Sequence, residues 1–191
     1  MALASKIATV TVDEYLSGEI SSDIKHEYDN GYVVAMVGAS SAHNLIAGSL
    51  YSEIRRHLKG RPCQVYISDM KVRIQTKLID RFYYPDVVVS CEKNPASEYF
   101  RDKPVLIIEV LSPSTETRDK LEKLSAYSTL PSLAEYFTVA QDRVEVTRYQ
   151  FEHGLAHMIH YQDGDTVDFA SIGFAIPVKN IYADVVGRVG E

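Results

Sequence analysis

The spacing of apolar and polar residues predicts a long helix in the first third of the chain. One face of this segment has an apolar residue at every fourth position, namely Ile46, Leu50, Ile54 and Leu58. Ser40 or Ser41 can cap the start of the helix, and Gly60 follows its expected end near Lys59. The pattern therefore predicts an amphipathic helix of about five turns.

Two local signals lie closer to the start of the chain. Thr11 and Glu14 have the spacing of a capping box, which predicts a short helix through Tyr15. Asn30-Gly31 lies between two extended runs, and this dipeptide is the strongest short-range signal for a β-hairpin.

The rest of the chain is rich in short apolar runs of strand length. They lie at residues 63–69, 71–75, 84–91, 104–111, 135–140, 144–151, 155–161 and 174–178. The charged segment 116–130 has a helical period and is expected to turn Leu121 and Leu124 inward. Early helices and late strands indicate an α/β protein with a mixed β-sheet flanked by helices and with additional C-terminal strands.

Composition and length narrow the class of protein. With 191 residues, 46% apolar and 24% charged, the chain is expected to form a single domain, residues 1–191. No apolar run approaches the ~20 residues that a membrane span needs, and the first residues lack the order of a signal peptide, so a cytoplasmic protein with no membrane partner is expected. Cys63 and Cys91 lie in apolar segments of strand length and are expected to be reduced core thiols.

The net charge of −6 argues against a protein that binds nucleic acids through a general coat of Lys and Arg. It does not exclude an enzyme that acts on phosphates, because a bound metal ion can supply the largest local charge in a site.

The apolar runs 84–91 and 104–111 each contain one carboxylate. Asp86 lies in "YPDVVVSC" and Glu109 in "PVLIIEVLSPST". A buried carboxylate costs several kcal/mol unless it is paired, hydrogen-bonded or bound to a metal. Neighbouring strands lie about 4.8 Å apart, so the two carboxylates could share one hard cation such as Mg²⁺ or Mn²⁺.

These motifs resemble one known family. "YPDVVVSC" together with "LIIEVLSPSTETRDKLEKLSAYSTLPSLAEYFTV" is similar to the Uma-type restriction-endonuclease-like family, a branch of the PD-(D/E)xK nuclease superfamily. The resemblance covers nearly the whole chain and includes "EYDNGYVVAMVGASSAHNLIAGSL" and "GFAIPVKNIYADV". It implies a restriction-endonuclease-like core and a metal-dependent site that cleaves DNA.

The resemblance also assigns roles to individual residues. Asp86 matches the aspartate of the PD motif, and Glu109 matches the acidic residue of the second motif. Glu27 matches an additional metal ligand or positioning residue, whereas Asp69 matches a recurring position of less defined role. Leu111 occupies the place of the usual lysine.

The missing lysine is expected on the following helix. Lys120 and Lys123 are both candidates, and Lys123 fits the pattern better because it precedes Tyr127 by four residues.

Simpler explanations compete with each assignment. A single carboxylate is more often a solvated strand end than a ligand, and the two lysines could belong to a solvated helix face. His43 could contact a substrate, but a capping or packing role fits as well. Arg55 to Arg61 form a basic patch that could contact phosphate or complement the helix dipole.

The histidines of "HGLAHMIHY" raise the question of a zinc site. On a strand, His157 and His160 face opposite sides, so with His153 they are expected to be exposed strand residues.

The preferred interpretation is a Mg²⁺- or Mn²⁺-dependent endonuclease acting on DNA. Its expected catalytic residues are Glu27, Asp86, Glu109 and Lys123, of which the three carboxylates bind the metal. The alternative is a catalytically inactive nuclease-fold module that binds or regulates, which the acidic charge and displaced lysine favour. A hydrolase of another phosphoester is a third option, and a homodimer through the late strands is compatible with any of them.

Overall fold

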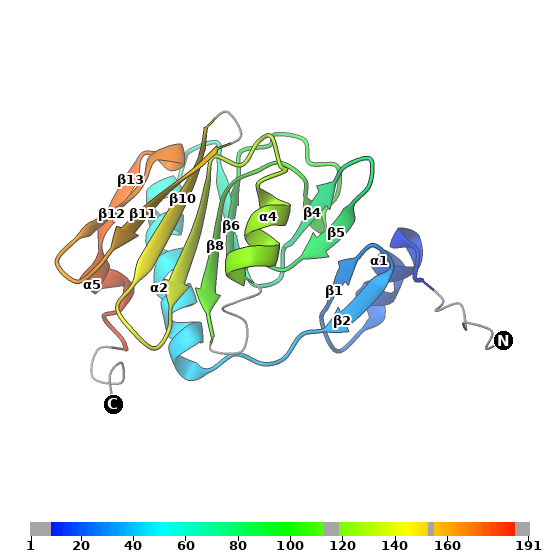
Figure 1. Ribbon diagram of the computed structural model, residues 1–191, viewed down its shortest axis with the longest axis horizontal. Helices are drawn as coiled ribbons and strands as arrows, with labels where there is room; N and C mark the ends of the chain where they lie inside the picture. The colour runs from blue at the N-terminus through cyan, green and yellow to red at the C-terminus, as the bar shows by residue number, and fades with distance from the viewer. Residues whose placement is uncertain (1–8, 113–118, 153–154, 186–191) are drawn as a thin grey trace.

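Two large β-sheets, a separate two-stranded sheet and the helices that cover them make up the structure, a computed structural model that describes residues 9–112, 119–152 and 155–185 (Figure 1). The larger sheet has six strands in the order β11-β10-β9-β8-β6-β3. Their bounds are β3 Gln64–Ile67, β6 Val87–Ser90, β8 Pro104–Leu111, β9 Glu135–Ala140, β10 Val146–Glu152 and β11 Leu155–Tyr161. β8 and β9 are parallel and every other neighbouring pair is antiparallel, so the sheet is mixed.

The second sheet has five strands in the order β2-β1-β5-β4-β7. Their bounds are β1 His26–Asp29, β2 Tyr32–Ala35, β4 Lys71–Gln75, β5 Asp80–Tyr83 and β7 Phe100–Arg101. A separate pair, β12 (Thr166–Phe169) and β13 (Phe174–Pro177), follows near the end of the chain. β13 matches the apolar run predicted at residues 174–178, whereas β12 was not among the predicted runs. The mixed α/β class is confirmed.

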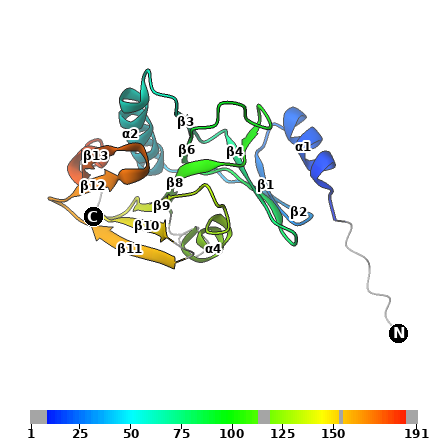
Figure 2. The same cartoon turned by 90° about the horizontal axis from the view of Figure 1, so that it is seen from above.

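Helix α2, Ser41–Leu58, packs its predicted apolar stripe against the six-stranded sheet. The hydroxyl of Ser40 caps the helix by accepting a hydrogen bond from the His43 N–H at 3.1 Å. Figure 2 shows α2 on one side of β8 and the short helix α4, Leu124–Tyr127, on the other. The central strands are therefore covered on both faces, which explains why every residue of β6 and β9 is buried.

The capping box and the hairpin of the N-terminal region are both confirmed. Thr11 and Glu14 cap α1, Val12–Ser21, through reciprocal side-chain bonds. Asn30 and Gly31 connect β1 to β2 with φ angles of +47° and +98°. Both values lie in the left-handed region that a two-residue hairpin turn requires and that Asn and Gly tolerate best.

The charged segment after β8 differs from the regular helix that its period predicts. Residues Asp119–Lys123 form one turn of π-helix, and only then does α4 begin. Leu121 is 65% exposed, so the expectation that it packs inward is wrong, whereas Leu124 does pack against the core. The wider π turn changes which side chains face inward. Of the three residues of this turn whose side chains are described, Lys123 is the buried one, and buried carboxylates compensate its charge.

A buried ion pair attaches the C-terminal strand pair to the six-stranded sheet. Glu135 on β9 accepts hydrogen bonds from the backbone N–H groups of Ala170 and Ser171, at 3.2 and 2.7 Å. Its carboxylate also pairs with Arg148 on β10 at 2.7 Å. The 3₁₀ turn Ala170–Ile172, η2, is thereby fixed to β9, and α5, Val178–Ile181, then packs beside α2.

The prediction of reduced cysteines is wrong, because the structure joins Cys63 and Cys91 in a disulfide. β3 and β6 are antiparallel, with Gln64 paired to Ser90, so one further step of the ladder sets the two cysteines opposite each other. Their Cα atoms are 4.0 Å apart. The sequence places each cysteine in a predicted strand but does not reveal that these two strands are neighbours.

Among the residues that the structure describes, no helix is both long enough and apolar enough to cross a bilayer.

Candidate active site

The pairing of β6 with β8 places the two motif carboxylates on neighbouring strands. Val87 lies opposite Ile108 in this antiparallel pair. Asp86 immediately precedes β6, so one further step of the same register sets it opposite Glu109. Directly opposite residues have Cβ atoms about 4.5–5.5 Å apart. The sheet therefore brings together the two residues that the sequence analysis singled out.

The Asp86 carboxylate is held by its neighbours at the end of the strand. Its Oδ2 accepts a hydrogen bond from the backbone N–H of Val110 at 2.7 Å, one residue beyond Glu109. The same oxygen lies 3.2 Å from Nε2 of His43, in the first turn of α2. His43 thus links the start of α2 to the motif aspartate, a contact that goes beyond the capping or packing role considered from sequence.

The segment before Asp86 is anchored on its other side by α1. The Tyr84 hydroxyl donates to Glu19 at 2.8 Å and accepts from the Lys71 ammonium at 3.0 Å. Burial raises the pKa of the Tyr84 hydroxyl, and its hydrogen bond to Glu19 adds to the shift, so this donor stays protonated at neutral pH. Glu19 of α1 and Lys71 of β4 therefore hold the side chain of the residue two positions before Asp86.

Glu109, Lys123 and Glu27 meet in the interior between the two sheets. The Lys123 ammonium lies 3.1 Å from Oε1 of Glu109 and 3.2 Å from Oε1 of Glu27. Glu109 comes from β8, Glu27 from β1 and Lys123 from the π turn, and all three side chains are buried. Residues far apart in the sequence thus share one charged cluster.

Two tyrosines complete the surroundings of this cluster. The Tyr127 hydroxyl donates to Oε1 of Glu109 at 3.1 Å. Burial raises the pKa of Tyr127 well above its usual value, and the negative charge of Glu109 raises it further. The Tyr83 ring lies beneath the Lys123 ammonium, 5.7 Å from its centroid, within the range of a cation–π contact.

The buried charges compensate one another. Moving a carboxylate into a protein interior costs several kcal/mol unless a counter-charge and hydrogen bonds replace its water. Here one ammonium contacts two carboxylates, and the Tyr127 hydroxyl adds a donor to Glu109. The arrangement keeps carboxylate oxygens and a positive charge together in a dry setting, where electrostatic interactions are strongest.

The chemistry of the donors fits a hard cation. Asp86 and Glu109 offer carboxylate oxygens from adjacent strands, and Mg²⁺ needs only one or two protein carboxylates when water and phosphate supply its other ligands. Within the described residues, no three His, Cys, Asp or Glu side chains are grouped closely enough to hold a metal by themselves. That Asp86 and Glu109 bind one metal ion, with Glu27 as a third ligand, stays a prediction.

Other predicted residues lie away from this cluster. Asp69 is 86% exposed and pairs with Lys25 at 2.8 Å. The basic patch begins at Arg55, twelve residues along α2 from His43, which is about 18 Å at the helical rise. It therefore occupies the opposite end of α2 from Asp86. The side chain of Lys120 lies outside the described part of the chain.

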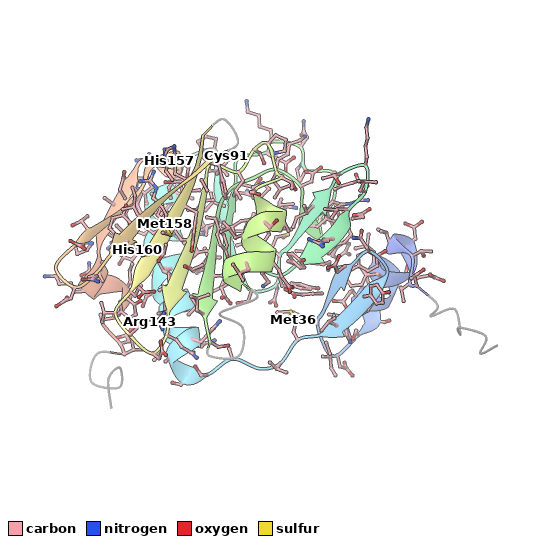
Figure 3. All side chains as sticks on the ribbon, viewed as in Figure 1. Met36, Cys91, Arg143, His157, Met158 and His160 are labelled. Atoms are coloured by element: carbon pink, nitrogen blue, oxygen red, sulfur yellow. A yellow bond between two sulfur atoms is a disulfide. The ribbon has the colours of Figure 1, made fainter. Side chains whose placement is uncertain are left out.

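The histidines of β11 are exposed, as predicted. His157 and His160 lie along this outer strand, where Figure 3 labels them. His160 Nδ1 is 3.0 Å from the Thr147 hydroxyl on β10. His153 falls outside the described residues.

Sequence reasoning missed two contacts of the candidate site. The Tyr127 hydroxyl bonds Glu109, although the sequence offered only its spacing from Lys123 as a signal. The contact of His43 with Asp86 joins positions 43 residues apart and has no local signal at all.

Two sheets flanked by helices, with the motif carboxylates at adjacent strand positions, are the architecture of a restriction-endonuclease-like protein. Residues 12–179 match the Uma2 family, described as "Putative restriction endonuclease", and the chain belongs to this family.

Relatives and a solved structure agree with this assignment. The chain is 36% identical over 172 residues to the Synechocystis protein slr1290, covering 89% of this chain and 90% of that one. It is 31% identical over 153 residues to Synechocystis sll1609, covering 78% and 85%. A crystal structure from Anabaena variabilis, described as "a putative nuclease belonging to DUF820", superposes with a TM-score of 0.70 at 18% identity, over 91% of this chain and 98% of that chain. This last likeness concerns the fold alone.

Proposed function

We propose that the protein is a Mg²⁺- or Mn²⁺-dependent endonuclease that hydrolyses phosphodiester bonds in DNA. The observation that carries this proposal is the placement of Asp86 beside Glu109, with the Asp86 carboxylate on the N–H of the next residue, Val110. Membership of a family described as restriction endonucleases supports DNA as the substrate.

Asp86 and Glu109 would hold the metal ion, with Glu27 assisting. The bound cation would polarise a phosphoryl oxygen and lower the pKa of an attacking water. The tasks of the protein are then to hold the two carboxylates ionised and correctly oriented. The Val110 N–H and His43 do this for Asp86, and the Tyr127 hydroxyl does it for Glu109.

Lys123 is proposed as the displaced lysine of the PD-(D/E)xK motif. Its ammonium contacts Glu109, a proposed metal ligand, and would therefore lie one residue away from the bound metal ion. A positive charge at this distance can orient an attacking water and stabilise the negative charge that develops on the phosphoryl group. The Tyr83 ring beneath it restricts where the ammonium can move.

Cleavage of supercoiled plasmid and of labelled single- and double-stranded oligonucleotides, with Mg²⁺, Mn²⁺ or EDTA, tests the proposal. Glu109→Gln keeps the volume of the side chain but removes the charge that a hard cation needs. We expect this variant to lose metal-dependent cleavage and to keep a cooperative thermal transition. Loss of the transition as well would make Glu109 a structural residue and remove the support for the nuclease.

A catalytically inactive binding module is the second candidate. The observation that favours it is the ion pairing of Lys123 with both Glu27 and Glu109, which balances charge without any metal, in a chain of net charge −6. Calorimetric titration with Mn²⁺ separates the two candidates. An endonuclease takes up the ion and cleaves DNA, whereas no uptake, even with DNA present, favours the binding module.

A further inference from the structure

Strand β2 is the outer edge of the five-stranded sheet. Among the described residues, β1 is its only strand neighbour, and all four β2 residues, Tyr32, Val33, Val34 and Ala35, are exposed. Val37, just beyond the strand, is exposed as well. Met36 lies where the chain leaves β2 for α2, as its label in Figure 3 shows. An exposed apolar edge of this kind is a template for pairing with another strand.

The edge lacks the charges that normally prevent such pairing. The segment from Tyr32 to Ser41 has no charged residue, in a chain of which 24% is charged. Natural edge strands are usually blocked by Lys or Pro, and neither occurs in this segment. A nucleic-acid backbone would require cations here. Two chains of net charge −6 repel each other least where the contacting surfaces are uncharged, so this strip fits a second copy of the chain.

The backbone of β2 is oriented for a second strand. The Met36 N–H donates to the Lys25 carbonyl at 2.8 Å, so the backbone of Met36 faces β1. Hydrogen-bonded and non-hydrogen-bonded pairs alternate along an antiparallel ladder. The backbone groups of Tyr32 and Val34 therefore also face β1, and those of Val33 and Ala35 point outward.

We propose that the protein forms a two-fold dimer in which β2 pairs antiparallel with β2 of a second copy, centred on Val34. Val33 of one copy then lies opposite Ala35 of the other, and each exchanges both of its outward backbone hydrogen bonds. An antiparallel pair of identical strands satisfies the self-complementarity that a two-fold interface requires. The two sheets become one continuous sheet across the interface.

The dimer would set the two candidate sites at a fixed separation. Glu27 lies opposite Val34 on β1, so the two copies of Glu27 are three strand spacings apart, about 14 Å. The inference rests on the exposed strand and not on the proposed catalysis. The experiment that tests the dimer measures molecular mass. A monomeric protein would therefore overturn the dimer and leave the nuclease proposal unchanged.

The outer strand β11 is the competing edge. It also exposes apolar residues, Met158 and Ile159, but His157 and His160 flank them. Figures 1 and 2 both place β2 and β11 at opposite ends of the molecule. The two edges can therefore be disrupted independently.

Val33→Lys and Ile159→Lys form a matched pair, because both residues are 40% exposed. Val34 lies opposite Glu27 and shares its face of the sheet. Successive side chains of a strand point to opposite faces, so the Val33 side chain is on the face away from the candidate site. Sedimentation velocity should find the wild-type protein at twice its mass of 21.4 kDa. A lysine desolvated within the interface should weaken the dimer at least ~10-fold for Val33→Lys, and Ile159→Lys should not.

A cysteine cross-link locates the interface directly. Residues on the axis form a non-hydrogen-bonded pair with Cα atoms about 4.5 Å apart, which a disulfide can bridge. Val34→Cys, in a background with Cys63→Ser and Cys91→Ser, should give a covalent dimer on oxidation that reductant reverses. A wild-type protein that stays monomeric at its highest soluble concentration, or a dimer that only Ile159→Lys disrupts, would overturn the inference. Circular dichroism of each variant checks that it is folded.

Discussion

Individual side chains of the candidate site are fixed by contacts from elements far apart in the sequence. Asp86 is held by a backbone N–H of β8 and by the first turn of α2. Glu109 is held by Lys123 and Tyr127. Each carboxylate thus has a donor that does not depend on solvent, which is the preorganisation that metal ligands require.

The two candidate lysines can be separated by mutation. Lys123 is buried against Glu27 and Glu109, so Lys123→Ala is expected to lower the rate of DNA cleavage with Mg²⁺ by about 10²–10³-fold, the usual value of a positioned electrostatic donor. Lys120→Ala is the matched control and should lose much less. Initial rates on plasmid DNA are the measurement.

Stability has to be measured beside these rates. Lys123→Ala leaves two buried carboxylates without their common cation, and breaking a buried pair typically costs about 3–5 kcal/mol. Urea unfolding of both variants therefore accompanies the assay, and rates are compared only for folded protein. A larger loss for Lys120→Ala would transfer the role to that residue. Negligible loss for both would remove the lysines from the mechanism.

At the level of elements, the sequence predicts those features that depend on local physics. The stripe of α2, the capping box of α1 and the Asn30-Gly31 turn all have signals within a few residues, and all three are confirmed. The mixed sheet follows from the number and order of apolar runs. The π turn was not predicted because the charged segment has an ordinary helical period, whereas the ion pairs of Lys123 with Glu27 and Glu109 exist only in the tertiary structure.

Strand pairing is where sequence reasoning reaches its limit. The motif resemblance brought Asp86 and Glu109 together, and the β6–β8 register agrees with it. Nothing comparable pointed to the pairing of β3 with β6, so Cys63 and Cys91 were assigned as free thiols. Likewise, Asp69 has a motif position but an exposed side chain paired with Lys25, because neither its neighbours nor its period indicates the direction it faces.

The disulfide between β3 and β6 is expected to stabilise the edge of the six-stranded sheet. It links residues separated by 28 positions, and loop-closure entropy for such a loop corresponds to about 3–4 kcal/mol. Cys63→Ser with Cys91→Ser should therefore lower the free energy of unfolding in urea by roughly this amount. Reductant should destabilise the wild-type protein and leave the double variant unchanged. Two reactive thiols in denatured, unreduced protein would instead show that the bond does not form.

At the scale of the whole molecule, buried tyrosines from several elements share a raised hydroxyl pKa. Burial raises the pKa of five tyrosine hydroxyls above the usual value of 10.0, and the shift is large for four of them, namely Tyr15, Tyr84, Tyr127 and Tyr182, and smaller for Tyr28. The four with large shifts each donate a hydrogen bond in the folded protein, to His26, Glu19, Glu109 and Ala140 respectively. The folded state therefore favours the protonated form of all four.

This preference predicts how stability depends on alkaline pH. In the unfolded chain these tyrosines ionise near pH 10, whereas in the folded protein they keep their protons to higher pH. Above about pH 10, where the unfolded chain has lost these protons, the folded state binds more protons than the unfolded state. The free energy of unfolding therefore falls as pH rises. The stabilisation is complete below about pH 10 and is lost above it.

Urea unfolding between about pH 8 and 11, followed together with tyrosinate absorbance, measures this dependence. Tyr127→Phe removes one of the four groups and should make the alkaline decline less steep. Tyr99→Phe is the matched control, because Tyr99 is exposed and its loss should leave the slope unchanged. If all tyrosines of the folded protein instead ionised near pH 10 without loss of stability, the hydroxyl of Tyr127 could not be a buried donor to Glu109. The proposed support of that carboxylate would then fail with it.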